Sequence, residues 1–178
     1  GGIGALNVSH VANPSLEFDT PSRKAEFYSA QAEHLGLPAL PIYEQPTEHT
    51  SLKQRYPLAL AQGRTLTHFH SFFNNGQVLP MLAKRDREPQ LWIAPEDAAA
   101  RKLLDGAAIR IFNGRGALQA QAKVTDMIPP GVVWMRDGWA GLNGLTSGAP
   151  VLPDHVVDHF AFSAGQAAYE AMVEVEAA

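Results

Sequence analysis

The alternation of apolar and polar residues is clearest over residues 118–124. One face would carry Leu118, Ala120, Ala122 and Val124, and the other Gln119, Gln121 and Lys123. A period of two predicts a β-strand with one face on a core. Before it, Ile109-Arg110-Ile111 predicts another strand, and Asn113-Gly114-Arg115-Gly116 predicts the turn that joins the two.

Three further apolar runs, residues 56–60, 91–93 and 132–135, predict strands, the last one suited to a strand buried on both sides. The second runs into Ala94-Pro95-Glu96-Asp97, a helix start with proline in the first turn and two acids at the positive end of the helix dipole. Apolar pairs four residues apart, Ala99 with Leu103 and Ala100 with Leu104, extend that helix to a stop at Asp105-Gly106. Short strands with one intervening helix favour a mainly β fold, a compact barrel with helical inserts, over a doubly wound sheet.

The first fifty residues have a weaker period. Leu16-Glu17-Phe18 and residues 24–28 flank the turn-forming Asp19-Thr20-Pro21-Ser22, which predicts a small hairpin. Residues 30–35 suit a short helix ending at Gly36, and residues 37–46 carry three prolines, which indicates an extended connector. We therefore expect an N-terminal extended arm and linker over residues 1–50, carried over from a preceding domain, and a barrel over residues 51–178.

Composition narrows the class of protein. The chain has 178 residues, 46% of them hydrophobic, which suits one globular core. A formal charge of -4 argues against general affinity for nucleic acid, and we expect no membrane span, because no apolar run approaches the roughly 20 residues that a spanning helix needs. Cysteine is absent, so this chain holds no disulfide, thiolate metal site or iron–sulfur cluster. The opening Gly-Gly-Ile-Gly, without methionine, favours a piece of a longer polypeptide, whose cytoplasmic or periplasmic location the sequence leaves open.

Candidate chemistry concentrates on residues 61–70, which follow the first apolar run of the barrel. The segment holds a glycine, an arginine, two threonines and two histidines, and it has no carboxylate. Glycine allows close approach of a backbone N–H to a ligand, while guanidinium and hydroxyl groups can bind phosphate oxygens from several directions. An anion-binding site at the carboxyl end of a strand is the prediction.

The order of motifs resembles the carboxy-terminal cofactor-binding domain of the molybdopterin oxidoreductases, the group that includes dimethyl sulfoxide reductase, periplasmic nitrate reductase and formate dehydrogenase. Five segments carry the resemblance. Residues 18–29 resemble the family's "TPSGKIEFYS" pattern, residues 63–70 its "GR…HxH" pattern and residues 94–99 its "NPEDA" pattern. Residues 112–116 resemble its "xNxRG" pattern, and residues 124–133 its "VTDxxxPGVV" pattern. Arg23 stands where the first of these patterns has glycine.

The resemblance implies a double-psi β-barrel and a site for one molybdopterin guanine dinucleotide, usually one of a pair that chelates molybdenum or tungsten. Gly63, Arg64 and Thr65 are candidates for contacts along the pterin and its phosphates, and His68 and His70, two apart on an extended segment, for donors on one side. Asn143 lies in a segment similar to the family's "NxLT" element. Phe162-Ser163 replaces the phenylalanine–lysine pair frequent near the family's end, which leaves Gln166 as a substitute contact.

Each residue also has a plainer interpretation. His68 and His70 are also compatible with zinc ligation, and His155 and His159 have the spacing of a metal pair on a helix but lack the glutamate of an H-E-x-x-H motif. Asn143 suits either a loop-stabilising amide or a ligand contact. Trp134 and Trp139 suit core or rim packing better than stacking on a cofactor, and Arg110 and Arg115 suit solvated positions.

Three classes of function remain open from the sequence. The leading one is a cofactor-binding domain that is not catalytic by itself, because the metal ligand, the substrate funnel and any iron–sulfur cluster belong to the remaining domains of a parent oxidoreductase. The second is a double-psi barrel that binds peptides or partner proteins. The third is a small hydrolase or decarboxylase, which the lack of a Gly-x-Ser-x-Gly elbow disfavours. No catalytic residue, substrate, oligomeric state or preference for molybdenum over tungsten follows from the sequence.

Overall fold

The computed structural model describes residues 18–67, 79–157 and 171–178, and the chain separates into two compact units, residues 1–44 and 45–178. In the first unit, helix α1 (Ala30–His34) begins where the Ser29 hydroxyl accepts a hydrogen bond from the Ala32 N–H at 3.1 Å, and the chain turns away at Gly36 with a φ of 72°. The short helix is confirmed. Residues 37–46 form no helix or strand, and their extended conformation stays a prediction.

The predicted hairpin in this unit is wrong over its described part. A turn is present, with the Arg23 N–H donating to the Thr20 carbonyl at 3.0 Å, but residues 18–28 contain no strand. Arg23 adopts a φ of 58°, a conformation that glycine reaches more readily. The turn-forming residues therefore predicted a turn correctly. The residues that flank it pair with no strand in the described part of the chain.

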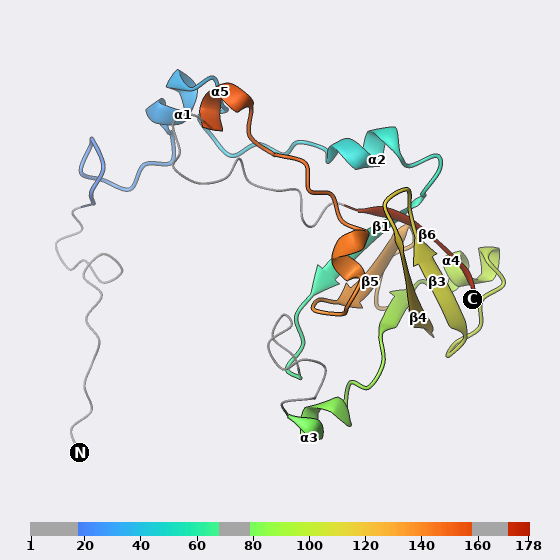
Figure 1. The fold of residues 1–178 in the computed structure, drawn as a ribbon. Coiled ribbons are helices and arrows are strands. Elements are labelled where there is room, and N and C mark those ends of the chain that lie inside the picture. The colour runs from blue at the N-terminus through green and yellow to red at the C-terminus, as the bar shows by residue number, and fades with distance from the viewer. Residues whose placement is uncertain (1–17, 68–78, 158–170) are drawn as a thin grey trace, which may run out of the picture. The chain divides into compact units, whose positions relative to one another are not determined.

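The second unit is built around a closed barrel of six described strands, in the order β1-β5-β2-β4-β3-β6 (Figure 1). Their bounds are β1 (Leu58–Gly63), β2 (Gln90–Ile93), β3 (Ala108–Phe112), β4 (Ala117–Val124), β5 (Val132–Arg136) and β6 (Met172–Ala177). The pairs β1/β5 and β2/β4 are parallel, and the other four pairs are antiparallel. The mainly β fold and the barrel are therefore confirmed, while the double-psi crossing of its loops stays a prediction.

The barrel core is made by inward-facing residues of every strand. Leu58, Leu91, Ile109 and Val133 are at most 1% exposed, and the alternation predicted for β4 is confirmed, with Ala120 and Ala122 buried and Leu118 and Val124 packed against the core. The prediction for β5 is wrong in one respect. Its outer face is only partly buried, because the ring of Trp134 lies there against Trp92 with centroids 4.9 Å apart.

Helix α4 (Pro95–Ala100) begins at the predicted proline but ends well before the predicted Asp105-Gly106 stop. Its chain leaves the helix at Lys102, which has a φ of 56°, and the Leu103 N–H returns to the Ala98 carbonyl at 2.9 Å. This turn buries Leu103 and leaves Leu104 76% exposed. Packing of one leucine in the core therefore overrides the helical spacing that predicted a longer helix.

Short helices occupy the connections of the second unit: α2 (Thr47–Ser51), α3 (Pro80–Ala83), the 3₁₀ turn η2 (Leu142–Gly144) and α5 (Asp154–Val157). In the described ranges, the helices are too short and too polar to traverse a bilayer. Helix α2 belongs to the barrel unit, although the sequence interpretation assigned most of it to the arm.

Candidate functional site

The end of strand β1 is shaped by small residues against a large ring. Leu58 and Leu60 face the core, while Ala61 and Gly63 pair with Trp134 and Arg136 of β5. A Cβ atom at Gly63 would lie 2.6 Å from Trp134 Nε1, closer than such atoms approach. Glycine is needed here because the indole of Trp134 occupies the space that a side chain would fill. The backbone conformation of Gly63 does not itself require glycine.

The residues after Gly63 form a polar rim. Arg64 is exposed, and the hydroxyls of Thr65 and Thr67 lie 2.8 Å apart. Thr67 Oγ1 in turn donates to the carboxylate of Asp86 at 3.0 Å. The rim is thus fixed to the segment that precedes β2, and the predicted Gly63, Arg64 and Thr65 lie together at the carboxyl end of β1.

Arg136 is the charged centre behind this rim. Its side chain is 4% exposed, and its Nε atom lies 2.6 Å from Asp86 Oδ2, while its guanidinium carbon lies 4.0 Å from the centre of the Trp139 ring. Burial lowers the pKa of Arg136 from its ordinary value, and the negative charges of Asp86 and Asp137 oppose that change. Arginine keeps its proton at neutral pH even so. The buried cation is therefore held by a carboxylate and an aromatic face.

A cavity of about 180 Å³ opens between these groups. Its lining combines two hydroxyls, two guanidinium groups, a carboxylate, an amide and three indole rings: Thr65, Thr67, Arg85, Asp86, Gln90, Trp92, Trp134, Arg136 and Trp139. Thr65 is the only member of this set that the sequence analysis assigned to the site. Arg136 and Asp137, a charged pair directly after the apolar run of residues 132–135 and buried in the structure, are the signal that was missed.

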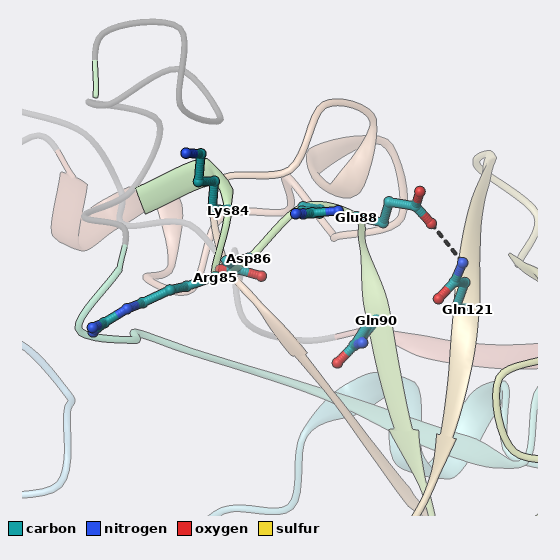
Figure 2. Close-up of a pocket in the computed structure, with 7 residues that line it drawn as sticks. Lys84, Arg85, Asp86, Glu88, Gln90 and Gln121 are labelled. Carbon is teal, nitrogen blue, oxygen red and sulfur yellow. Dashed lines mark hydrogen bonds between the residues drawn. The ribbon is translucent and has the colours of Figure 1, made fainter. Parts of the chain in front are cut away.

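A second, more polar cavity of about 330 Å³ adjoins it and shares Arg85, Asp86 and Gln90 (Figure 2). Lys84, Arg85 and Arg87 are exposed there. Gln90 and Gln121 lie opposite each other on β2 and β4, and Glu88 accepts a hydrogen bond from Gln121 Nε2 at 2.5 Å. The basic residues Lys84, Arg85 and Arg87 therefore lie beside the aromatic and hydroxyl lining of the first cavity.

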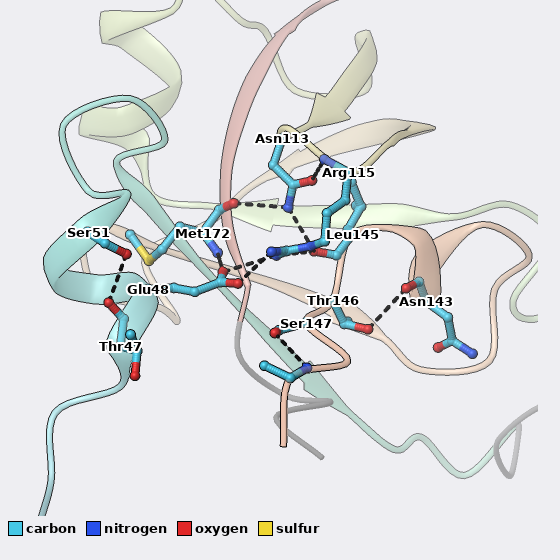
Figure 3. A network of polar contacts seen from close by, with 11 residues as sticks. Thr47, Glu48, Ser51, Asn113, Arg115, Asn143, Leu145, Thr146, Ser147 and Met172 are labelled. Atoms are coloured by element: carbon cyan, nitrogen blue, oxygen red, sulfur yellow. Dashed lines mark hydrogen bonds and ion pairs between the residues drawn. The ribbon is translucent and has the colours of Figure 1, made fainter. Parts of the chain in front are cut away.

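Asn143 lies apart from this cavity, on the η2 turn that packs on β4. Its backbone carbonyl accepts hydrogen bonds from the Thr146 N–H and hydroxyl at 3.4 and 3.1 Å. Figure 3 shows its side-chain amide directed away from that contact, and no described residue hydrogen-bonds to this amide, which is exposed. The backbone of Asn143 therefore stabilises the turn while its amide stays exposed, and the ligand contact of that amide stays a prediction.

The other predicted site residues, His68, His70 and Gln166, lie outside the described residues, as does His159. Within the described ranges, no cluster of three or more histidine, aspartate or glutamate side chains has the geometry of a metal site. The zinc interpretation of His68 and His70 therefore stays a prediction.

Known proteins resemble this chain over more than half of its length. Residues 58–161 match the family model described as "Molydopterin dinucleotide binding domain". The chain is 36% identical over 123 residues to the dimethyl sulfoxide/trimethylamine N-oxide reductase of Cereibacter sphaeroides, which covers 67% of this chain and 15% of that protein. It is 30% identical over 161 residues to the probable oxidoreductase YoaE of Bacillus subtilis, covering 90% of this chain and 22% of that protein.

A solved structure has the same fold. The acetylene hydratase from Pelobacter acetylenicus matches 92% of this chain and 24% of its own chain, with a TM-score of 0.71 and 22% sequence identity. The chain spans between about a seventh and a quarter of these proteins. Because the family model matches more than half of the chain, this chain belongs to the molydopterin dinucleotide binding domain family.

Proposed function

We propose that this domain holds one molybdopterin guanine dinucleotide in a larger molybdenum or tungsten oxidoreductase. Gly63, Arg64 and Thr65 would contact the pterin and its phosphates, with Asn143, His68, His70 and Gln166 as further contacts. The cavity lined by Thr65, Thr67, Arg85 and Arg136 carries the proposal, because it combines hydroxyl and guanidinium donors with flat aromatic faces at the rim.

The donor set suits such a group. Phosphate oxygens need charged or hydroxyl donors, and a pterin or guanine ring needs a flat apolar surface with amide-like hydrogen bonds at its edge. Gln62 Nε2, on the strand that ends at the rim, is buried without a hydrogen-bond partner among the described residues, but Gln62 does not line this cavity, so the fit depends on the donors that do. Arg85 adds a positive charge that Asp86 does not cancel, because Asp86 is paired with Arg136.

Size limits what this cavity can hold. A volume of about 180 Å³ is below the roughly 300–1,000 Å³ typical of pockets that enclose a drug-sized ligand. One ring or the diphosphate fits here, and the rest of a dinucleotide must be covered by other groups. This agrees with a domain that supplies one wall of a cofactor site shared with the remaining domains of the enzyme.

In the whole enzyme, the bound cofactor supplies oxygen-atom or electron-pair transfer at its metal. The part of this domain is to bind, orient and shield the organic portion, and the isolated chain would be inactive. We place the metal ligand, the substrate channel and any iron–sulfur cluster in other parts of the parent enzyme. Of these, the lack of cysteine excludes a thiolate metal ligand and an iron–sulfur cluster from this chain.

Replacement of Arg64 by alanine in the whole enzyme tests the proposal. Loss of a charged hydrogen bond to phosphate costs about 1.5–3 kcal/mol, so cofactor binding should weaken roughly tenfold to a hundredfold. Molybdenum and released guanine nucleotide are measured per mole of purified enzyme. Arg110→Ala is the matched control, because that arginine forms an exposed ion pair with Glu176 on the barrel surface. Equal cofactor content in the two variants would reject the role of Arg64.

A further inference from the structure

One backbone carbonyl, that of Leu145, collects an unusual number of donors. It accepts hydrogen bonds from Asn113 Nδ2 at 2.7 Å, from Arg115 Nη2 at 2.7 Å and from Arg115 Nε at 3.1 Å (Figure 3). A carbonyl oxygen has two lone pairs, so three donors saturate it. The two side chains come from the turn between β3 and β4, and Leu145 directly follows the η2 turn.

Both donor side chains are themselves held in place. The carboxylate of Glu48 on α2 accepts from Arg115 Nη1 at 2.5 Å and Nη2 at 3.0 Å, and from the Met172 N–H at 3.0 Å. Asn113 donates additionally to the Met172 carbonyl at 3.1 Å and accepts from the Arg115 N–H at 2.9 Å. Neither side chain can rotate without losing several bonds. Arg115 lies in the turn and is exposed, as the sequence suggested, but its guanidinium is engaged by Glu48 and the Leu145 carbonyl.

These contacts fix the residue that directly follows the η2 turn, which carries Asn143. Leu142 and Leu145 are at most 1% exposed, and the Leu145 N–H donates to the Leu142 carbonyl at 3.0 Å. At Gly116 the two turns approach so closely that a Cβ atom would lie 3.1 Å from the Gly144 carbonyl oxygen. The turn has little freedom to shift, and the exposed Asn143 amide is carried on it.

We infer that Asn113 and Arg115 are positioning residues for Asn143, which they orient toward the cofactor by gripping the Leu145 carbonyl. The inference rests on the proposed function, because Asn143 is a proposed cofactor contact. Glu48 completes the device by neutralising the guanidinium and holding it in the plane that reaches Leu145. A flexible turn would present the amide in several directions and would lose part of its binding energy to ordering.

A double-mutant cycle in the whole enzyme tests the inference. Arg115→Lys keeps a positive charge opposite Glu48 but cannot reproduce the arginine fork, so the grip on Leu145 is weakened. Cofactor release from the purified enzyme is followed by fluorescence of the liberated pterin for Arg115→Lys, Asn143→Ala and the double variant. We expect release to be faster by about tenfold in each single variant, the effect of one lost hydrogen bond. The double variant should release no faster than Asn143→Ala alone.

The outcomes separate the two proposals. Faster release in Asn143→Ala with multiplied effects in the double variant would overturn the positioning role and leave the Asn143 contact standing. Unchanged release in Asn143→Ala would remove that contact from the proposed function and the positioning role with it, while the Arg64 test still decides the rim. Asn113→Ala removes a different donor and replaces Arg115→Lys if the latter does not fold. Arg101→Ala, which breaks an ion pair on another side of the barrel, should lower the melting temperature without changing release.

Discussion

At the residue scale, the rim of the site depends on how little space Gly63 takes. The outer face of the barrel carries Lys123 over the ring of Trp92 at 4.2 Å, and Trp92 against Trp134. Trp134 extends over β1, where Ala61 and Gly63 offer no bulk. A row of small residues on one strand thus accommodates a row of large ones on its neighbours.

Gly63→Ala should destabilise the domain by about 1–3 kcal/mol, the usual cost of overpacking. The added methyl would meet Trp134 at 2.6 Å, and that ring is confined by Trp92. Denaturant unfolding followed by tryptophan fluorescence measures the change. Gly148→Ala is the control, because a Cβ there meets nothing within 4 Å. Similar stabilities of the two variants would show that Trp134 moves aside at little cost.

At the element scale, the barrel is closed by β6, which pairs with both β1 and β3. From Val173 to Ala177 its sequence alternates apolar and acidic residues, which fits a half-buried strand, but the sequence analysis made no prediction there. Arg101, at the end of α4, ties this strand to the helix by donating from Nε to Glu174 Oε1 at 2.5 Å. Its Nη1 atom donates to the Asp97 carbonyl at 3.1 Å.

Arg101→Ala should cost about 1–2 kcal/mol of stability, because a partly buried, charge-assisted contact and one backbone bond are lost together. Arg110→Ala removes a comparable arginine–glutamate pair to β6, but with side chains 45% and 50% exposed, so its cost should be within about 0.5 kcal/mol. The two midpoints of urea unfolding are compared under the same conditions. A larger loss for Arg110→Ala would contradict the importance assigned to burial.

At the scale of the whole molecule, α2 is joined to the barrel by a contact across a long stretch of chain. Glu48 reaches Arg115 and the Met172 N–H, 67 and 124 residues away. Glu48 is buried and paired with residues of the barrel, so α2 contributes to the stability of the barrel unit. That unit therefore begins before this helix. A boundary at residue 50, which the proline-rich connector suggested, would cut this helix.

A chain starting at residue 45 should unfold at the same denaturant concentration as a chain starting at residue 18, whereas one starting at residue 53 should be less stable by about 2–4 kcal/mol. The shorter chain leaves the Arg115 guanidinium and the Met172 N–H without their carboxylate partner. Glu48→Ala in the longer chain should reproduce most of that loss. Equal stability of the chains starting at 45 and 53 would place the domain boundary after α2.

The sequence by itself determined the features that arise from neighbours along the chain. The alternation of β4, the proline start of α4 and the turn at residues 113–116 depend on period and local backbone preference, which residues carry wherever they are placed. The strand before Gly63 and the ordered motifs of the family are also local features of the sequence. They led to the prediction of a site at Gly63, Arg64 and Thr65.

Tertiary structure decided the features that depend on partners far apart in sequence. The pairing of Arg136 with Asp86 and Trp139, the grip of Asn113 and Arg115 on Leu145, and the early end of α4 follow from which groups the closed barrel brings together. A buried charge has to find an opposite charge or hydrogen-bond partners, and a core leucine has to fill a space. Neither requirement produces a periodic pattern in the sequence. These parts of the candidate site could therefore be identified only from the tertiary structure.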